Sequence, residues 1–268
     1  MDTPEAPPDD PREAMWRAIL TSPDPNRRKR RLFLRIPSSP RCKLCAAPFG
    51  PPGSLWMSRV GHPRWAKNPR YCAACFGMIR ANHGGAEVEC SLLFADVRGS
   101  TPMAEGMSAT DFRRLMGRFY DTATEVLVTH DAIVDKFVGD EVVAIFLPSM
   151  AGPAHARRAI DAAESLLNKT GHADAKGPWV PLGAGVNTGI AFVGSIGEDM
   201  DTDLTALGDV VNTTARLASA AAAGEILVTD SAMARAGMST DRLEHRSLAL
   251  KGKSETTGVH VLKVAPGS

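Results

Sequence analysis

The sequence lacks three features that would each assign the protein to a particular class. No apolar run approaches the length of about 18 residues that a membrane-spanning helix needs. The first ten residues, MDTPEAPPDD, are acidic and rich in proline, and so do not resemble a secretory signal. The net charge is only +1, which gives no general attraction to nucleic acid or to an anionic membrane. We therefore expect a cytoplasmic protein without a membrane partner.

The chain has room for one full-sized domain and a smaller one. It has 268 residues, of which 44% are hydrophobic and 23% charged, as in ordinary globular proteins. We expect residues 1–40 to be a mostly flexible segment with a short helix from Pro11 to Leu20 and a basic run, 27–31, that acts as a solvated linker. Residues 41–85 would form a small module, and residues 87–264 the main domain.

Cysteine is scarce, but four of the five cysteines form two C-x-x-C pairs with 26 residues between them. In a reducing compartment such pairs favour metal binding over disulfides, and four thiolates suit a tetrahedral, structural Zn²⁺ in a ribbon-like module. A module this small has little core, so the metal would supply much of its stability. A redox dithiol or incidental surface cysteines are the alternatives. The expected ligands are Cys42, Cys45, Cys72 and Cys75.

Three further residues near these pairs are not expected to bind metal. His62 and His83 are interpreted as loop histidines rather than zinc ligands. Cys90 lies alone in an apolar run and is interpreted as a core residue.

The main domain shows a regular alternation of strand and helix patterns. Its order of strand, helix, strand, strand, helix, strand is that of the α+β, ferredoxin-like (split βαβ) fold, which we expect to form an antiparallel sheet with the first strand beside the third. Two more strands, around LALKGK and VHVLKV, would close the domain. The main predicted elements are strand 88–97, helix 108–130, a hairpin over 132–147, helix 154–169, a strand in 180–197, helix 208–221 and strand 225–230.

Two carboxylates meet in this arrangement. Asp96 ends the first strand and Asp140 begins the third, so both would lie at neighbouring strand ends. A pair of divalent cations would relieve their repulsion, and hard oxygen ligands suit Mg²⁺. The backbone of Gly99, Ser100 and Thr101, near a helix start, would be able to cradle phosphate. The plainer interpretation is that each aspartate occupies a turn.

Four segments in order resemble the class III nucleotidyl (adenylate/guanylate) cyclase catalytic domain, over roughly residues 87–264. They are FADVRGST (94–101), KFVGDEVVAIF (136–146), TALGDVVNTTAR (205–216) and LKGKSETTGVHVL (250–262). The resemblance implies conversion of ATP to 3′,5′-cyclic AMP and pyrophosphate with two Mg²⁺ or Mn²⁺ ions. It also implies roles for particular residues: metal binding by Asp96, the Val97 carbonyl and Asp140; ribose orientation by Asn212; transition-state stabilisation by Arg216; base recognition by Lys136 and Thr205; and phosphate contact by Lys251.

The two base-reading positions favour adenine over guanine. The Lys136 ammonium would donate to adenine N1, whereas guanine N1 carries a proton and would face it donor to donor. The Thr205 hydroxyl would accept from the adenine amino group. Thr205 stands where many adenylate cyclases have Asp, so the chain resembles the Thr-type subgroup.

The resemblance also implies a homodimer, because the family's active site is shared between two chains. The chain has one copy of each residue that the family's active site requires, so a symmetric dimer would hold two complete sites. The cysteine module would bind a protein partner, brace the dimer, or sense metal or redox state.

Four alternatives stay open. The first is a catalytically silent, cyclase-like regulatory domain, and the second a guanylate-using cyclase. The third is a diguanylate cyclase, although its Gly-Gly-Asp/Glu-Glu-Phe turn is missing. The last is a zinc-ribbon protein that binds nucleic acid, which the near-zero net charge makes unlikely.

Overall fold

The computed structural model describes residues 10–23, 27–36, 38–66, 68–197, 202–250 and 256–264. Contacts divide the chain into two units, Met1–Val88 with Phe192–Leu207, and Glu89–Ala191 with Gly208–Ser268. We describe each unit by itself. Among the described residues, no helix is long and apolar enough to cross a membrane.

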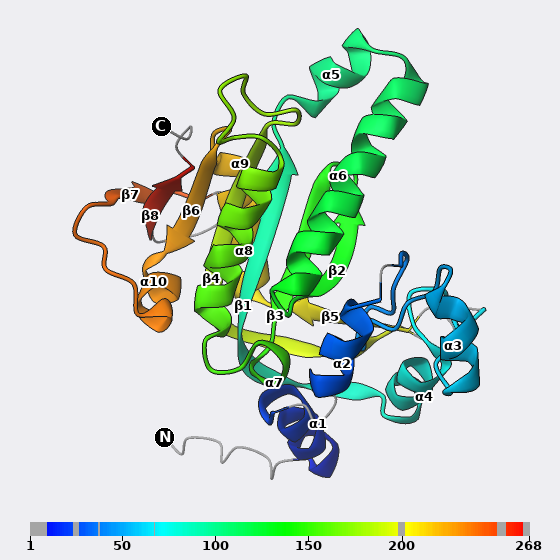
Figure 1. Cartoon of the computed structure of the whole chain (residues 1–268). Coiled ribbons are helices and arrows are strands. Elements are labelled where there is room, and N and C mark those ends of the chain that lie inside the picture. The colour runs from blue at the N-terminus through cyan, green and yellow to red at the C-terminus, as the bar shows by residue number, and fades with distance from the viewer. Residues whose placement is uncertain are drawn as a thin grey trace, which may run out of the picture. The chain divides into compact units, whose positions relative to one another are not determined.

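Eight strands of the described residues form one sheet (Figure 1). Seven follow the order β2-β3-β1-β4-β6-β8-β7, and β5 pairs with β4 outside that path. The strands are β1 (Gly84–Val97), β2 (Ile133–Val138), β3 (Glu141–Phe146), β4 (Leu182–Ile196), β5 (Asp203–Leu207), β6 (Glu225–Thr229), β7 (Glu244–Leu248) and β8 (Thr257–Lys263).

The part of the sheet formed by β2, β3, β1 and β4 confirms the predicted split βαβ arrangement. Strand β1 lies between β3 and β4, and it pairs antiparallel with β3 from Ser91↔Phe146 to Asp96↔Glu141. The expectation of a purely antiparallel sheet is wrong, because β4 and β6 pair in parallel. A parallel pair needs a crossover connection, and helix α9 (Asp209–Ala220) lies in the segment between these two strands.

Helices cover both faces of the sheet in the larger unit. Helices α6 (Ala109–Thr129) and α8 (His155–Lys169) lie side by side on one face, as Figure 1 shows. Ile226 and Val228 of β6 join their apolar core, whereas the intervening Leu227 packs with Leu217 of α9. Because successive strand side chains point to opposite faces, α9 covers the other face.

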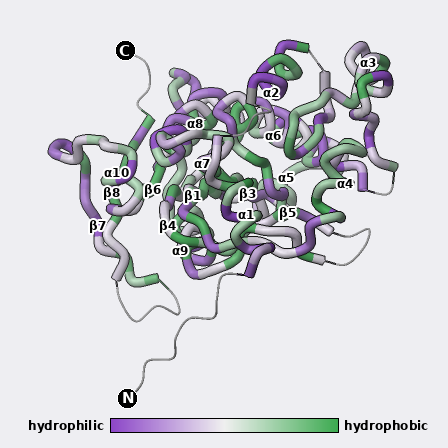
Figure 2. The backbone as a smooth tube through the Cα atoms, turned by 90° about the horizontal axis from the view of Figure 1, so that it is seen from below, coloured by the Kyte–Doolittle hydropathy of each residue, from purple (hydrophilic) through white to green (hydrophobic). Residues whose placement is uncertain are grey.

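The edge of the sheet is more polar than its centre. Strand β6 (EILVT) is buried along its length, whereas β7 (EHRSL) has no fully buried residue, and the hydropathy colours of Figure 2 show the same contrast. Polar residues on an edge strand reduce pairing with other chains. The first strand of the final pair is displaced from the prediction: β7 ends at Leu248, the first residue of LALKGK, and Lys251 lies outside the described residues.

Helix α6 begins as predicted, and a helix that was not predicted precedes it. The Ser108 hydroxyl accepts from the Asp111 amide at 3.1 Å and donates to the Asp111 carboxylate at 2.7 Å. Helix α5 (Ser100–Gly106) is separate from α6. The other short helices of this unit are α7 (Pro148–Ala151) and α10 (Asp230–Ala236).

The smaller unit contains four helices within its described residues: α1 (Pro11–Thr21), α2 (Arg27–Leu34), α3 (Gly53–Arg59) and α4 (Ala73–Ala81). Helix α1 confirms the predicted short helix and buries Trp16 and Leu20. The prediction that the basic run is a solvated linker is wrong in two respects, since the run is helical and Arg30 is buried, whereas Arg28, Lys29 and Arg31 are exposed as predicted. The run lies in α2, where the Arg30 side chain is buried and donates to the Leu44 carbonyl at 2.7 Å. An arginine with its long apolar stem can pack inward when a backbone carbonyl accepts a hydrogen bond from its guanidinium.

Candidate functional site

The two predicted metal-binding aspartates lie at neighbouring strand ends. Asp96 is in register with Glu141, the residue after Asp140. The Val97 amide donates to the Asp140 carbonyl, with nitrogen and oxygen 3.2 Å apart. The structure therefore brings the backbones of Asp96, Val97 and Asp140 together as the sequence predicts.

The cationic side chain of Arg98 lies against the carboxylate of Asp96. Arg98 forms a very short ion pair with the Asp96 carboxylate, and its guanidinium also donates to the Ser219 carbonyl at 2.8 Å. Burial together with the negative Asp140 raises the pKa of Glu141 to about 7. Asp96 and Asp140 lie at adjoining strand ends, and a divalent cation there would offset their negative charge.

The donor set at these strand ends fits a divalent cation such as Mg²⁺ or Mn²⁺. Carboxylate oxygens and a backbone carbonyl are the hard ligands that these ions prefer. The guanidinium at Asp96 shows that a positive group is accommodated there. Asp96, Asp140 and the Val97 carbonyl would hold the metal.

The hairpin between β2 and β3 positions Asp140 and Lys136. Gly139 adopts φ +61° at the turn, a conformation that glycine reaches without steric cost. The Tyr120 hydroxyl of α6 donates a very short hydrogen bond to the Gly139 carbonyl. A bulge between Val134 and Lys136 shifts the register of β2, and such bulges redirect side chains. The Lys136 ammonium lies 3.5 Å from the Asp135 carboxylate, and the Lys136 side chain as a whole is 45% exposed.

Helix α9 presents Asn212 and Arg216 away from the sheet. The residues are four apart, so both lie on one side of the helix, while Thr213 and Leu217 face the sheet and are buried. Asn212 is exposed and Arg216 partly exposed. Glycine on β4 lets the helix come close: a Cβ at Gly185 would lie 2.6 Å from the Ala218 nitrogen.

The remaining predicted nucleotide-contact residues occupy three places. Thr205 lies on β5 in the smaller unit, opposite Gly194 of β4, and is buried. Gly99 precedes α5 with φ +71°, and Ser100 and Thr101 begin that helix. Lys251 lies outside the described residues.

The four predicted zinc ligands converge. Their sulfur atoms all lie within 4.8 Å of one another, and all four cysteines are free thiols. The Cys45 and Cys72 sulfurs are 3.7 Å apart, close to the edge of about 3.8 Å of a tetrahedron with Zn–S bonds of about 2.3 Å. The donor set therefore fits Zn²⁺.

His62 contacts this cluster, which the sequence alone did not reveal. Its Nδ1 lies 3.1 Å from the Cys72 sulfur. The position resembles that of an outer-shell group that orients a metal ligand. The sequence gave little indication that His62 lies at the cluster, because it is in a loop, ten residues from the nearest of the four cysteines.

The smaller unit contains a second polar cluster that the sequence gave no reason to expect. The Asp203 carboxylate on β5 accepts hydrogen bonds from Lys43 at 2.8 Å, from Arg70 at 2.6 Å and from the Tyr71 hydroxyl. Lys43 and Tyr71 each neighbour a cysteine of the cluster in sequence. Opposite charge and these bonds outweigh desolvation and hold the pKa of Asp203 below its usual value, so the carboxylate stays ionised.

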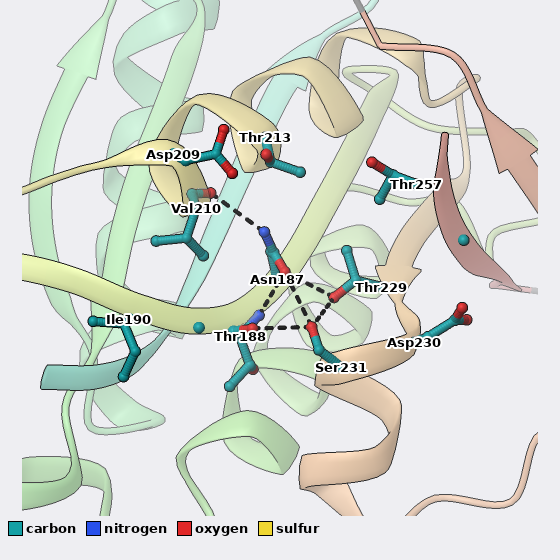
Figure 3. Close-up of a pocket in the computed structure, with 12 residues that line it drawn as sticks. Asn187, Thr188, Ile190, Asp209, Val210, Thr213, Thr229, Asp230, Ser231 and Thr257 are labelled. Atoms are coloured by element: carbon teal, nitrogen blue, oxygen red, sulfur yellow. Dashed lines mark hydrogen bonds between the residues drawn. The ribbon is translucent and has the colours of Figure 1, made fainter. Parts of the chain in front are cut away.

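A cavity of about 410 Å³ lies in the larger unit, between β4, α9, α10 and β8 (Figure 3). Asn187 of β4 forms hydrogen bonds to two other walls of the cavity. The Asn187 side-chain amide donates to the Val210 carbonyl at 3.3 Å and accepts from the Thr229 hydroxyl at 2.8 Å. Among the described residues, none of those predicted to contact metal or nucleotide lines this cavity. It is therefore a separate feature of the domain.

The fold and the paired aspartates define a nucleotidyl cyclase catalytic domain. A family model of the adenylate and guanylate cyclase catalytic domain matches residues 85–263. Because this match covers well over half of the chain, the protein belongs to that family.

Curated relatives include adenylate cyclases. Adenylate cyclase 1 of Rhizobium meliloti is 32% identical over 148 residues, which are 52% of this chain and 22% of the relative. The terminal-differentiation-specific adenylate cyclase of Dictyostelium discoideum is 29% identical over 178 residues, 63% of this chain and 8% of the relative. The chain thus spans less than a quarter of the length of either relative.

Solved structures give the same fold. The adenylyl cyclase CyaB from P. aeruginosa matches with a TM-score of 0.58 and 27% identity, over 67% of this chain and 96% of that chain. The guanylyl cyclase Cya2 matches with a TM-score of 0.60 and 24% identity, over 69% and 95%. At 24% identity, the match to Cya2 shows a similar fold alone.

Proposed function

We propose that the protein is an adenylate cyclase that converts ATP to 3′,5′-cyclic AMP and pyrophosphate in intracellular signalling. The single observation that carries this proposal is the placement of Asp96 and Asp140 at adjoining strand ends, joined by the Val97–Asp140 hydrogen bond. The adenylate cyclases among its relatives support the choice of reaction.

The reaction is an in-line attack of the ribose 3′-oxygen on the α-phosphorus, with pyrophosphate leaving. Asp96, Asp140 and the Val97 carbonyl would hold two Mg²⁺ or Mn²⁺ ions, which when bound would make the 3′-hydroxyl more acidic and offset the negative charge of the leaving group. Asn212 orients the ribose, and Arg216 supplies positive charge to the oxygens of the transition state. Gly99, Ser100, Thr101 and Lys251 contact the phosphates.

Lys136 and Thr205 read the base. An ammonium that donates to adenine N1 repels the protonated N1 of guanine, which gives a physical basis for preferring ATP. The exposed Lys136 ammonium supports this role, because it is available to a ligand.

The active site forms between two chains, with the metal aspartates from one protomer and Lys136, Thr205, Asn212 and Arg216 from the other. The protein is then a cytoplasmic homodimer with a structural Zn²⁺ in each four-cysteine module.

The proposed reaction is tested by product identification. Purified protein is incubated with Mn²⁺ and ATP, GTP or an equimolar mixture of the two. The cyclic product is identified by mass spectrometry, with Asp140→Ala as the blank. Cyclic AMP as the main product from an equimolar mixture supports the proposal. Cyclic GMP would make the protein a guanylate cyclase, and no cyclic product would favour a silent regulatory domain.

A further inference from the structure

Two histidines and an aspartate meet at the edge of the sheet, away from the residues proposed to bind nucleotide, catalytic metal or zinc. His245 of β7 and His260 of β8 are directly opposite each other in the antiparallel pair. Asp230, the first residue of α10, lies against both rings. Its carboxylate is 3.2 Å from His245 Nε2 and 3.2 Å from His260 Nε2. One ligand atom from each residue thus lies within 4.8 Å of the other two.

We propose that Asp230, His245 and His260 form a binding site for a divalent transition-metal ion such as Zn²⁺. Two imidazole nitrogens and one carboxylate are a ligand set for Zn²⁺, Fe²⁺ or Co²⁺ rather than for Mg²⁺. Metal–ligand bonds of about 2.0–2.1 Å place tetrahedral ligand atoms about 3.3 Å apart, which agrees with the two distances.

The surroundings of the three residues favour this use. The buried Nδ1 of His260 has no hydrogen-bond partner among the described residues, so the polar interactions of this ring run through Nε2, which faces Asp230. Gly258 makes the approach of Asp230 possible, because a Cβ there would lie 2.1 Å from the carboxylate. A larger residue at this position would push the carboxylate out of line with the histidines.

The site lies at the rim of the 410 Å³ cavity. Asp230, Thr257 and Gly258 are among the cavity's lining residues, and Figure 3 shows the Asp230 carboxylate turned away from the Asn187 network. Three protein ligands leave at least one coordination position open, as in zinc sites that take an exogenous ligand. The exposed His245 and Asp230 give that position access to solvent.

Metal titration tests the site without using cyclase activity. The full chain carries Asp140→Ala, to weaken the proposed catalytic metal site, and one equivalent of Zn²⁺ is added first to fill the cysteine cluster. Co²⁺ is then added, and bound metal is measured by equilibrium dialysis and visible absorption. We expect one further Co²⁺ per chain, with d–d bands but no thiolate charge-transfer band.

Variants decide whether the three residues bind it. Asp230→Asn, which keeps the shape of the side chain, and the double variant His245→Ala/His260→Ala should each weaken this Co²⁺ binding at least tenfold. His83→Ala is the matched control, since it removes an exposed histidine elsewhere. Equal cobalt binding by the parent and Asp230→Asn would overturn the proposal and leave Asp230 as a counter-ion of the histidines. Thermal unfolding of each variant checks that it is folded.

A second inference rests on the Asp203 cluster, which shares no residue with the first. Lys43 lies beside Cys42, and Tyr71 beside Cys72, so both belong to the backbone that the cysteine cluster holds. Lys43 donates to the Asp203 carboxylate and also to the Leu204 carbonyl at 2.7 Å, and Tyr71 accepts from the Leu204 amide at 3.0 Å. The Lys43 side chain is 5% exposed.

We infer that metal binding at the four cysteines positions Thr205 through Asp203. Asp203 and Thr205 are two residues apart on β5, so their side chains lie on the same face of the strand. Asp203 is then a positioning residue, and the cysteine module makes recognition of the base depend on its metal or redox state. This inference rests on the proposed role of Thr205 in reading adenine.

Hydrogen exchange and kinetics test this link separately. Removing the metal from the full chain with a chelator should speed amide exchange of residues 203–207 at least tenfold. Asp203→Asn should raise the KM for ATP more than it lowers kcat and reduce ATP-over-GTP selectivity, with the bound zinc unchanged. Arg59→Ala is the control, because it removes an exposed arginine from helix α3 of the same unit and leaves the donors to Asp203 in place.

The outcomes separate this inference from the proposed function. Unchanged exchange at 203–207 after loss of the metal would overturn the link, even if the protein makes cyclic AMP. Faster exchange without any nucleotide turnover would uphold the structural link and reject the adenylate cyclase proposal.

Discussion

The amide of Val97 donates to the carbonyl oxygen of Asp140 at 3.2 Å, across the ends of β1 and β3. This bond fixes Asp140 beside Asp96, although 44 residues separate them in sequence. Replacing Asp140 by Asn keeps the size of the side chain and the backbone bond but removes a negative charge. We predict that Asp140→Asn lowers Mn²⁺-dependent turnover by at least about 100-fold, as measured by initial rates over a Mn²⁺ titration.

The control for this prediction is Asp121→Asn, which removes an exposed carboxylate from α6. It should leave turnover unchanged. If Asp140→Asn retained full activity with an intact far-ultraviolet circular dichroism spectrum, Asp140 would not be a metal ligand.

Variants of Arg216 test whether its guanidinium stabilises the negative charge of the transition state. Its place on the outer side of α9, one turn after Asn212, leaves it clear of the apolar core. Arg216→Ala should lower kcat on the order of 100- to 1000-fold while changing the KM for ATP little. Arg216→Lys keeps the charge but loses the planar fork and should recover only part of the rate. Single-turnover measurements distinguish this pattern from a binding defect, which would appear in KM alone.

Lys136 tests recognition of the base. In Lys136→Glu a carboxylate replaces the ammonium, so it would accept from guanine N1–H and face the lone pair of adenine N1. One hydrogen bond of this kind is worth about 1–3 kcal/mol, and the ratio of kcat/KM for ATP to that for GTP should therefore fall at least tenfold. Competition between the two nucleotides in one reaction gives the ratio directly. An unchanged ratio would remove Lys136 from the base site.

The sequence predicted the elements that carry local patterns. The apolar run before Asp96, the amphipathic face of α6 and the turn at Gly139 identified the split βαβ core, because burial and glycine conformation act over a few residues. The four cysteines were identified by their spacing. Each of these signals is contained in a short stretch of chain.

Long-range pairings were not visible in the same way. The Asp203 cluster joins residues about 130 to 160 positions apart, and nothing near Lys43 or Asp203 marks them as partners. The Asp230–His245–His260 group likewise arises from the pairing of β6, β7 and β8. Arg30 was misjudged because charge alone predicted exposure, whereas the Leu44 carbonyl makes its burial tolerable.

Stability should fall on acidification in two separate steps. Burial lowers the pKa of His155 below 6.5, so its neutral form stabilises the fold above pH 6.5, and that contribution is lost as the pH falls below it. Hydrogen bonds from Arg246 lower the pKa of Glu225 from 4.5 to about 2, so its contribution is lost between pH 4.5 and 2. Each step has a limiting slope of about 1.4 kcal/mol per pH unit.

Urea unfolding at a series of pH values measures both steps. His155→Gln should flatten the upper step and leave the lower one, whereas Glu225→Gln should do the reverse. Glu225→Gln should also cost roughly 1–3 kcal/mol at pH 7, since the amide oxygen of Gln can accept only one of the two Arg246 hydrogen bonds, at 3.0 and 2.8 Å, and carries no charge. Identical pH profiles for both variants and the parent would mean that other groups dominate acid unfolding.

Mixed dimers test the central claim, an active site whose metal aspartates and arginine come from different chains. Asp96→Ala and Arg216→Ala chains, each inactive alone, are mixed, and mixed dimers are isolated through two different affinity tags. Our account predicts cyclic AMP production at up to about half of the parent rate per dimer, because one of the two sites regains all of its groups. Isolated mixed dimers that produce no cyclic AMP would contradict it.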